Sequence, residues 1–153
     1  MLDIASIKRN FAHALRRGCS ESSCTLRLDY LSDHIVLNGE VICEDRKMCD
    51  CIVFVVNSSV TIGVVELKSR TIHTSEVLDK LTNSSEIALG IFEKYGSRRT
   101  KPIFLHILLH KGLDGTERRK LGKTRIKVRG KEYGIITKPC GSFFSTIISK
   151  FKV

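Results

Sequence analysis

Two apolar segments separated by a three-residue turn constrain the fold of this chain more than any other feature. Residues 51–56 read Cys-Ile-Val-Phe-Val-Val, residues 60–65 read Val-Thr-Ile-Gly-Val-Val, and Asn-Ser-Ser lies between them. Runs of this length, rich in β-branched residues and bounded by turn-forming residues, are typical of strands. The spacing therefore predicts an antiparallel β-hairpin in a hydrophobic sheet.

Charged residues stand at the open end of this hairpin. Asp50 precedes the first strand, and Glu66-Leu67-Lys68 ends the second. Because strand side chains alternate between the two faces, Glu66 and Lys68 share one face and Leu67 points to the other. The short turn brings the start of the first strand beside the end of the second, so Asp50 lies within reach of Glu66. Two carboxylates and an amine at the edge of a sheet are the parts of a metal-dependent phosphodiesterase.

This arrangement resembles the PD-(D/E)XK nuclease superfamily. The family pattern is an acid at a strand start, a short hairpin, and an acid-x-Lys triplet followed by a helix. Asp50 and the Glu66-x-Lys68 triplet carry the resemblance, Cys49 replaces the proline of the motif, and the matched segment covers roughly residues 25–95. The resemblance implies an α/β fold with a restriction-endonuclease-like αβββαβ core, in which helices flank a mixed central sheet.

The resemblance also implies roles for the site residues. Asp50, Glu66 and the backbone carbonyl of Leu67 would bind Mg²⁺, for which Mn²⁺ would substitute. Mg²⁺ retains several waters, so one or two carboxylates suffice to hold it beside a substrate phosphate. Lys68 would orient or deprotonate the attacking water, or stabilise the charged transition state. The alternative interpretation is a solvated strand end, where these charges have no catalytic role.

Many relatives use a further acid, and some carry a supporting polar residue on the helix after the triplet. Glu21 and Asp29 are the candidates for the acid, and Lys80 is the candidate for the supporting residue. Each of the three is also compatible with an ordinary surface charge.

The second half of the chain is strongly basic. The net charge of the whole chain is +10 and its pI is about 9.5, and residues 94–131 contain thirteen Lys or Arg and two acids. Basic residues that alternate with Ile126 and Val128 predict a strand with one basic face, which suits a phosphate backbone. The predicted nucleic-acid-binding residues are Arg98, Arg99, Arg118, Arg119, Lys120, Lys123, Arg125, Lys127 and Arg129.

Apolar periodicity predicts helices over residues 4–17 and 74–95, which end at Gly18 and Gly96. Asn38-Gly39 predicts a turn. The length of 153 residues and the absence of a linker predict one domain, 1–153. Further strands are expected within 25–31, 34–37, 103–109, 126–128 and 133–137, and a last helix within 141–153.

Of the six cysteines, Cys49 and Cys51 are expected to pack in the core, and structural thiols are favoured over metal ligands. Zinc sites usually combine two closely spaced ligand pairs, and Cys49-Asp50-Cys51 has no such second pair. The N-terminal segment lacks the apolar core of a secretory signal, so a disulfide scaffold is not expected and a cytoplasmic location is. No apolar stretch approaches the ~18–20 residues of a membrane span, so no membrane partner is expected.

Taken together, the sequence predicts a metal-dependent endonuclease that hydrolyses phosphodiester bonds, with DNA favoured over RNA. The resemblance includes repair and defence nucleases, some of which act as homodimers. Two alternatives share the basic composition: a nucleic-acid-binding protein that retains the nuclease fold without activity, and a structural protein of a ribonucleoprotein. The form of the substrate, whether duplex, branched junction or single strand, is not specified by these patterns.

Overall fold

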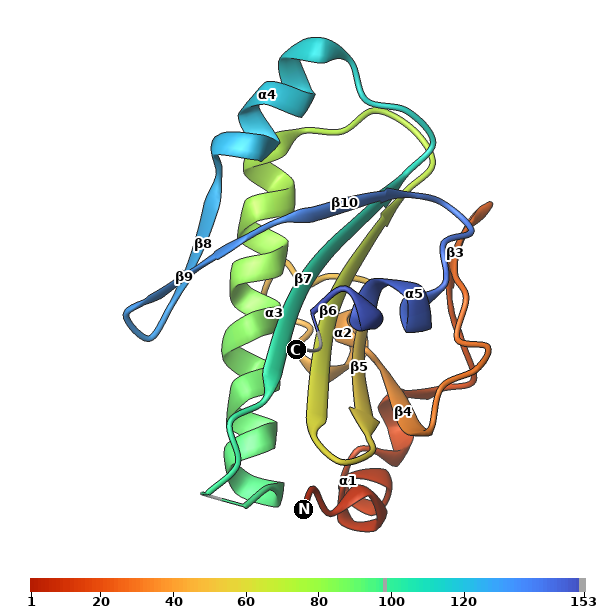
Figure 1. Ribbon diagram of the computed structural model, residues 1–153, viewed down its shortest axis with the longest axis vertical. Helices are drawn as coiled ribbons and strands as arrows, with labels where there is room; N and C mark the ends of the chain where they lie inside the picture. The colour runs from red at the N-terminus through yellow and green to blue at the C-terminus, as the bar shows by residue number, and fades with distance from the viewer. Residues whose placement is uncertain (98, 152–153) are drawn as a thin grey trace.

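A mixed six-stranded sheet forms the centre of the molecule in the computed structural model, which describes residues 1–97 and 99–151 (Figure 1). The strand order is β1-β4-β5-β6-β7-β10. Neighbours from β1 to β6 pair antiparallel, whereas β7 is parallel to both β6 and β10. The strands are β1 (Leu15–Arg16), β4 (Asp33–Asn38), β5 (Cys51–Val56), β6 (Val60–Lys68), β7 (Ile103–His110) and β10 (Ile136–Pro139).

The predicted hairpin is confirmed as β5 and β6. Its register pairs Val56 with Val60 beside the turn and Cys51 with Val65 at the open end. Nearly every side chain of the two strands is buried, because both faces of the sheet are covered. This two-sided burial explains why the strands read as continuous apolar runs rather than as an alternating pattern.

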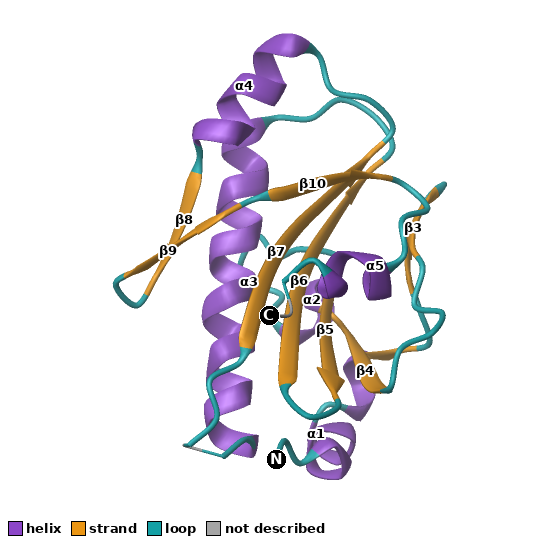
Figure 2. Ribbon diagram, viewed as in Figure 1, coloured by secondary structure: helices purple, strands orange, loops and turns teal. Residues whose placement is uncertain are grey.

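Each face of the sheet has its own hydrophobic core. Helix α3 (Thr74–Tyr95) connects β6 to β7 and covers one face, where Val77, Leu81 and Ala88 join the core with α1 (Ile4–Asn10) (Figure 2). On the other face, α5 (Phe144–Ser149) packs with a small hairpin formed by β2 (Cys19–Glu21) and β3 (Cys24–Leu26). The α/β class and the mixed sheet with flanking helices agree with the expectation.

The remaining elements follow β7. Helix α4 (Gly115–Lys123) leads into a hairpin of β8 (Arg125–Val128) and β9 (Lys131–Gly134), which packs against α3 through buried Ile126 and Val128. The turn between β8 and β9 places Arg129 and Gly130 at φ values of 49° and 80°. Positive φ is ordinary for glycine and uncommon for other residues.

Several predicted boundaries are wrong. The first helix ends at Asn10 and is followed by a 3₁₀ turn (Ala12–Ala14) and β1, so it does not reach residue 17. The strand predicted over 25–31 is only the last two residues of β3, and the strand predicted over 133–137 is divided between β9 and β10. Asn38-Gly39 is not a hairpin turn. Asn38 instead caps the short helix α2 (Gly39–Ile42) by accepting hydrogen bonds from two backbone N–H groups of its first turn.

The expectation that the chain forms no disulfide scaffold is wrong for four of the six cysteines. Cys19 is bonded to Cys51, and Cys24 to Cys140, with Cα–Cα separations of 6.0 and 4.9 Å. The two bonds attach the β2–β3 hairpin to strand β5 and to the segment after β10. Cys43 and buried Cys49 are free thiols.

In the part of the chain that the structure describes, no helix is both long and apolar enough to cross a membrane.

Candidate active site

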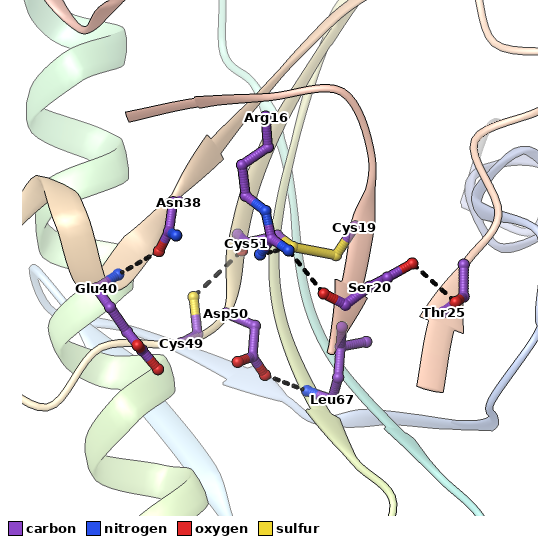
Figure 3. Close-up of a disulfide and its surroundings, with 10 residues drawn as sticks. All are labelled: Arg16, Cys19, Ser20, Thr25, Asn38, Glu40, Cys49, Asp50, Cys51 and Leu67. Carbon is purple, nitrogen blue, oxygen red and sulfur yellow. Dashed lines mark hydrogen bonds between the residues drawn. A yellow bond between two sulfur atoms is a disulfide. The ribbon is translucent and has the colours of Figure 1, made fainter. Parts of the chain in front are cut away.

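Asp50 and Glu66 lie side by side on the face of the sheet that α3 covers. The antiparallel register pairs Cys51 with Val65, so the next residues outward are Asp50 and Glu66. Asp50 is 7% exposed and Glu66 is 1% exposed. Asp50 Oδ2 accepts a hydrogen bond of 2.7 Å from the backbone N–H of Leu67, which ties the two strand ends together (Figure 3).

Backbone contacts fix the start of β5, and with it Asp50. The N–H of Cys49 donates to Ser84 Oγ of α3 at 2.8 Å, and the N–H of Gly39 donates to the carbonyl of Asp50 at 3.3 Å. A Cβ on Gly39 would lie 2.2 Å from the Cys49 carbonyl oxygen, so this close approach requires glycine. Ser84 thus has a structural role in α3, and the helix continues through the Asn83-Ser84-Ser85 segment without interruption.

Two lysines reach the buried Glu66. Lys80 Nζ of α3 lies 3.0 Å from Glu66 Oε2, and Lys68 Nζ lies 3.7 Å from the same oxygen. Both ammonium groups also contact Glu76 Oε1, at 3.2 Å from Lys80 and 3.7 Å from Lys68. The two glutamates and two lysines therefore form a closed network of four ion pairs, which we call the charge square.

Burial raises the pKa of Glu66 to about 8, and the neighbouring Asp50 carboxylate adds to the shift while Lys80 opposes it. Burial by itself would lower the pKa of Lys80, but Glu66 and Glu76 together hold it above its usual value. The pKa of Glu76 is lowered by its hydrogen bond to Lys80 and by the charge of Lys68. Lys80 is therefore a cation at neutral pH, whereas Glu66 is mostly protonated there.

The donor set fits a hard divalent cation. Both buried oxygens of Glu66 accept no hydrogen bond of regular geometry, although Lys80 lies within ion-pair distance, so they are available to a metal ion. Asp50 and Glu66, with the carbonyl of Leu67, would be its protein ligands. Among residues 1–97 and 99–151, no group of three or more His, Cys, Asp or Glu side chains could hold a metal ion. Waters and phosphate oxygens would complete the coordination, as is usual for Mg²⁺.

The candidate third acids do not join this site. Glu21 is exposed on β2, and exposed Asp29 pairs with Arg27 at 3.4 Å. Lys80, predicted as a supporting residue, does contact Glu66. Glu76 was not identified from the sequence, although its spacing of four residues from Lys80 on a helix is the usual signature of an ion pair.

The predicted nucleic-acid-binding residues separate into three regions of the molecule. Arg99 follows the C-terminal end of α3, at the opposite end from α4 (Figure 1), and Arg98 lies outside the described residues. Thr74 Oγ1, in the first turn of α3, donates a hydrogen bond to Glu117 of α4, so α4 lies beside the helical turn that also carries Glu76. The four basic side chains of α4 are exposed: Arg118, Arg119, Lys120 and Lys123.

The β8–β9 hairpin carries the other predicted basic residues. Arg125 and Lys127 are exposed while Ile126 and Val128 are buried, so the predicted alternation is confirmed. Arg129 instead forms ion pairs with Glu93 and Glu86 of α3, which neutralise its charge locally. The basic surface beside the first turn of α3 is therefore α4 rather than the end of this hairpin.

Comparisons of the chain with protein-family models, with curated proteins and with solved structures found no match.

Proposed function

We propose that this protein is a metal-dependent nuclease whose site consists of Asp50, Glu66 and Lys68. The observation that carries the proposal is a pair of buried carboxylates at adjacent strand ends, with a partly exposed lysine on the same face. Burial of two adjacent carboxylates is unfavourable for folding unless one of them binds a proton or a cation lies beside them. Titratable groups with shifted pKa values are concentrated at functional sites.

The order of elements supports the same proposal. Helix α1 precedes the antiparallel meander β4-β5-β6, and α3 then crosses over to β7, which lies parallel to β6. This series agrees with the αβββαβ core of restriction-endonuclease-like proteins. Asp50 precedes β5, and Glu66 and Lys68 end β6, which is the arrangement that the resemblance implies for the site.

The chain's own residues would divide the work of hydrolysis among them. A bound divalent cation would supply positive charge for the phosphoryl oxygens and lower the pKa of a coordinated water. Asp50 and Glu66 would hold that ion, and Glu66 would lose its proton as the ion binds. Lys68, 23% exposed, would orient the attacking water or stabilise charge on the phosphate. Lys80 lies closer to Glu66 and would fix the position of its carboxylate.

Nucleic acid, with DNA favoured, is the proposed substrate because the basic helix α4 lies beside the first turn of α3. Exposed Lys and Arg side chains bind a phosphate backbone through counterion release, without reading its sequence. The contact between Thr74 and Glu117 joins α4 to the helix that carries Glu76 and Lys80. A backbone bound along α4 would therefore pass close to the first turn of α3.

One observation favours a second candidate, a binding protein of the same fold without catalytic activity. Glu66 is 1% exposed and already paired with two lysines, which is also the arrangement of a purely structural buried ion pair. The two candidates differ only in turnover, so a cleavage assay separates them.

The decisive experiment is a cleavage panel of branched, linear and single-stranded DNA and RNA, with Mg²⁺, Mn²⁺ and EDTA lanes. We expect cleavage with either metal, none in EDTA, and loss of cleavage in Asp50→Asn with DNA affinity retained. Asp33→Asn removes the same charge from exposed Asp33 on β4 and serves as the matched control. Cleavage by Asp50→Asn at the wild-type rate would rule out the proposed site. If the wild-type protein cleaves no substrate, the second candidate, a binding protein without catalytic activity, is favoured.

A further inference from the structure

The exposed corner of the charge square is a carboxylate held between two cations. Glu76 lies in the first turn of α3, and its Oε1 is 3.2 Å from Lys80 Nζ and 3.7 Å from Lys68 Nζ. The Glu76 side chain is 38% exposed, while those of Lys68 and Lys80 are 23% and 18% exposed. All three side chains are therefore partly accessible to solvent, and Glu76 is the most accessible of them.

The two carboxylates of the square differ in whether a ligand can replace them. Glu66 is almost fully buried and is fixed in strand β6, so it cannot leave the lysines. Glu76 has a flexible side chain at the rim, and rotation about its bonds would carry the carboxylate into solvent. An ion pair that solvent reaches contributes little stability, so a competing anion could displace the Glu76 carboxylate.

The chemistry of the vacated position would suit a phosphodiester. Two ammonium groups that converge on one carboxylate oxygen provide the charge and the donors that a non-bridging phosphate oxygen accepts. The position is near the basic helix α4, because Glu76 and Thr74 share the first turn of α3 and Thr74 contacts Glu117 of α4.

We propose that Lys68 and Lys80 form a phosphate-binding subsite that Glu76 occupies in the free protein, and that a backbone phosphate of nucleic acid displaces the Glu76 carboxylate on binding. This inference deepens the proposed function and rests on it for the identity of the ligand. Glu76 is thus an internal competitor, which lowers affinity for nucleic acid and keeps both lysines ordered until a phosphate arrives.

The test is to measure DNA affinity in EDTA, where no cleavage occurs, with a fluorescein-labelled duplex and fluorescence anisotropy. Glu76→Gln keeps the shape of the side chain and removes the competing charge, so it should bind the duplex about three- to tenfold more tightly than the wild type. Asp79→Asn is the matched control, because it removes one negative charge from an exposed position three residues further along the same helix. It should change affinity by less than about twofold, since charges exposed to solvent are screened by salt.

A second pair of variants identifies the cations. Adding Lys80→Met to Glu76→Gln should remove the gain in affinity, and adding Lys68→Met should do the same if both lysines contact the phosphate. Circular dichroism and thermal melting establish that each variant is folded before its affinity is compared.

The outcomes separate this inference from the nuclease proposal. Equal affinities of Glu76→Gln and Asp79→Asn would overturn the subsite, as would a gain that persists without Lys80. Weaker Mg²⁺ binding by Glu76→Gln in calorimetry, without tighter DNA binding, would identify Glu76 as a metal ligand and also overturn it. Tighter binding by Glu76→Gln supports the subsite even if the wild-type protein cleaves nothing, in which case only the nuclease proposal fails.

Discussion

Lys68 and Lys80 contact the same oxygen of Glu66, yet their surroundings assign them different roles. Lys80 is the nearer of the two, at 3.0 Å, and belongs to a long helix that is packed along the sheet. Lys68 is 3.7 Å away, ends its strand, and is the more exposed. A group that acts on substrate must be reachable, whereas a group that positions a buried carboxylate need only be close to it.

Lys68→Met should therefore affect turnover and spare the fold. Methionine keeps most of the side-chain stem and removes the ammonium, so we expect single-turnover cleavage to fall by about 10²-fold or more. Mg²⁺ affinity, measured by calorimetry, should change little or increase, because a repelling cation has been removed. Cleavage by Lys68→Met at the wild-type rate would show that the lysine is not catalytic.

The sequence allowed part of this site to be predicted. Alternation along β6 placed Glu66 and Lys68 on one face, and the short turn placed Asp50 beside Glu66, because both rules depend only on local geometry. Glu76 was missed because a helical residue becomes part of a site only when its helix packs at a particular rotation on the sheet. Asp29 is also a carboxylate, as Glu76 is, but it is exposed and lies away from Asp50 and Glu66.

At the scale of whole elements, the β2–β3 hairpin shows what the sequence did not reveal. Its cysteines are bonded to partners 32 and 116 residues away, so spacing along the chain carried no signal for the pairing. Helix α3 was predicted at its observed limits because its apolar residues follow a 3.6-residue period over many turns. Helix α2 was missed because its single turn is too short to show such a period, and its cap residues also suit a hairpin turn.

Reduction of the two disulfides should lower thermal stability substantially. Loops of these lengths correspond to about 3–5 kcal/mol each in the chain-entropy model, and about 1 kcal/mol shifts the Tm of a domain this size by roughly 2–4 °C. We expect a loss of about 10 °C or more in melts with a phosphine reductant, and a smaller change for Cys43→Ser, which leaves both bonds intact. Thiol titration of the unreduced, denatured chain should find two free thiols; six would contradict the pairing.

Helix α4 should supply the phosphate contacts. Replacing three of its exposed basic residues by Ala should reduce the slope of log K against log salt by about one unit per lost contact. A triple variant at the far end of α3 removes the same charge and should leave the slope nearly unchanged. The α4 variant combines Arg118, Arg119 and Lys123, and the control combines Lys94, Arg99 and Lys101. Equal effects of the two variants would place the binding surface elsewhere.

For the molecule as a whole, two buried titratable groups give opposite pH dependences of stability. Burial lowers the pKa of His106 to about 4 from 6.5, and the imidazole stacks on Phe104 and contacts Tyr133 without a hydrogen-bond partner. The unfolded chain therefore binds the extra proton between these pH values, and stability is lost as pH falls through this window. Glu66 behaves in the opposite way. Its pKa is raised from 4.5 to about 8, so the stability that its protonated form provides is lost as pH rises.

These two pH windows overlap between about pH 4.5 and 6.5. In that range the folded state binds a proton at Glu66 and the unfolded state binds one at His106, so their effects on stability offset each other. Measured in EDTA, Tm should vary little from these two groups across that range and fall between about pH 6.5 and 8, where Glu66 acts alone. One proton corresponds to about 1.4 kcal/mol per pH unit. Glu66→Gln should abolish the loss above pH 6.5. His106→Phe, which preserves the aromatic stack, should leave Glu66 uncompensated, so that Tm rises as the pH falls from 6.5 to 4.5. A decline above pH 6.5 that is as steep in Glu66→Gln as in the wild type would show that Glu66 is ionised in the folded protein, because its lysine partners then outweigh its burial.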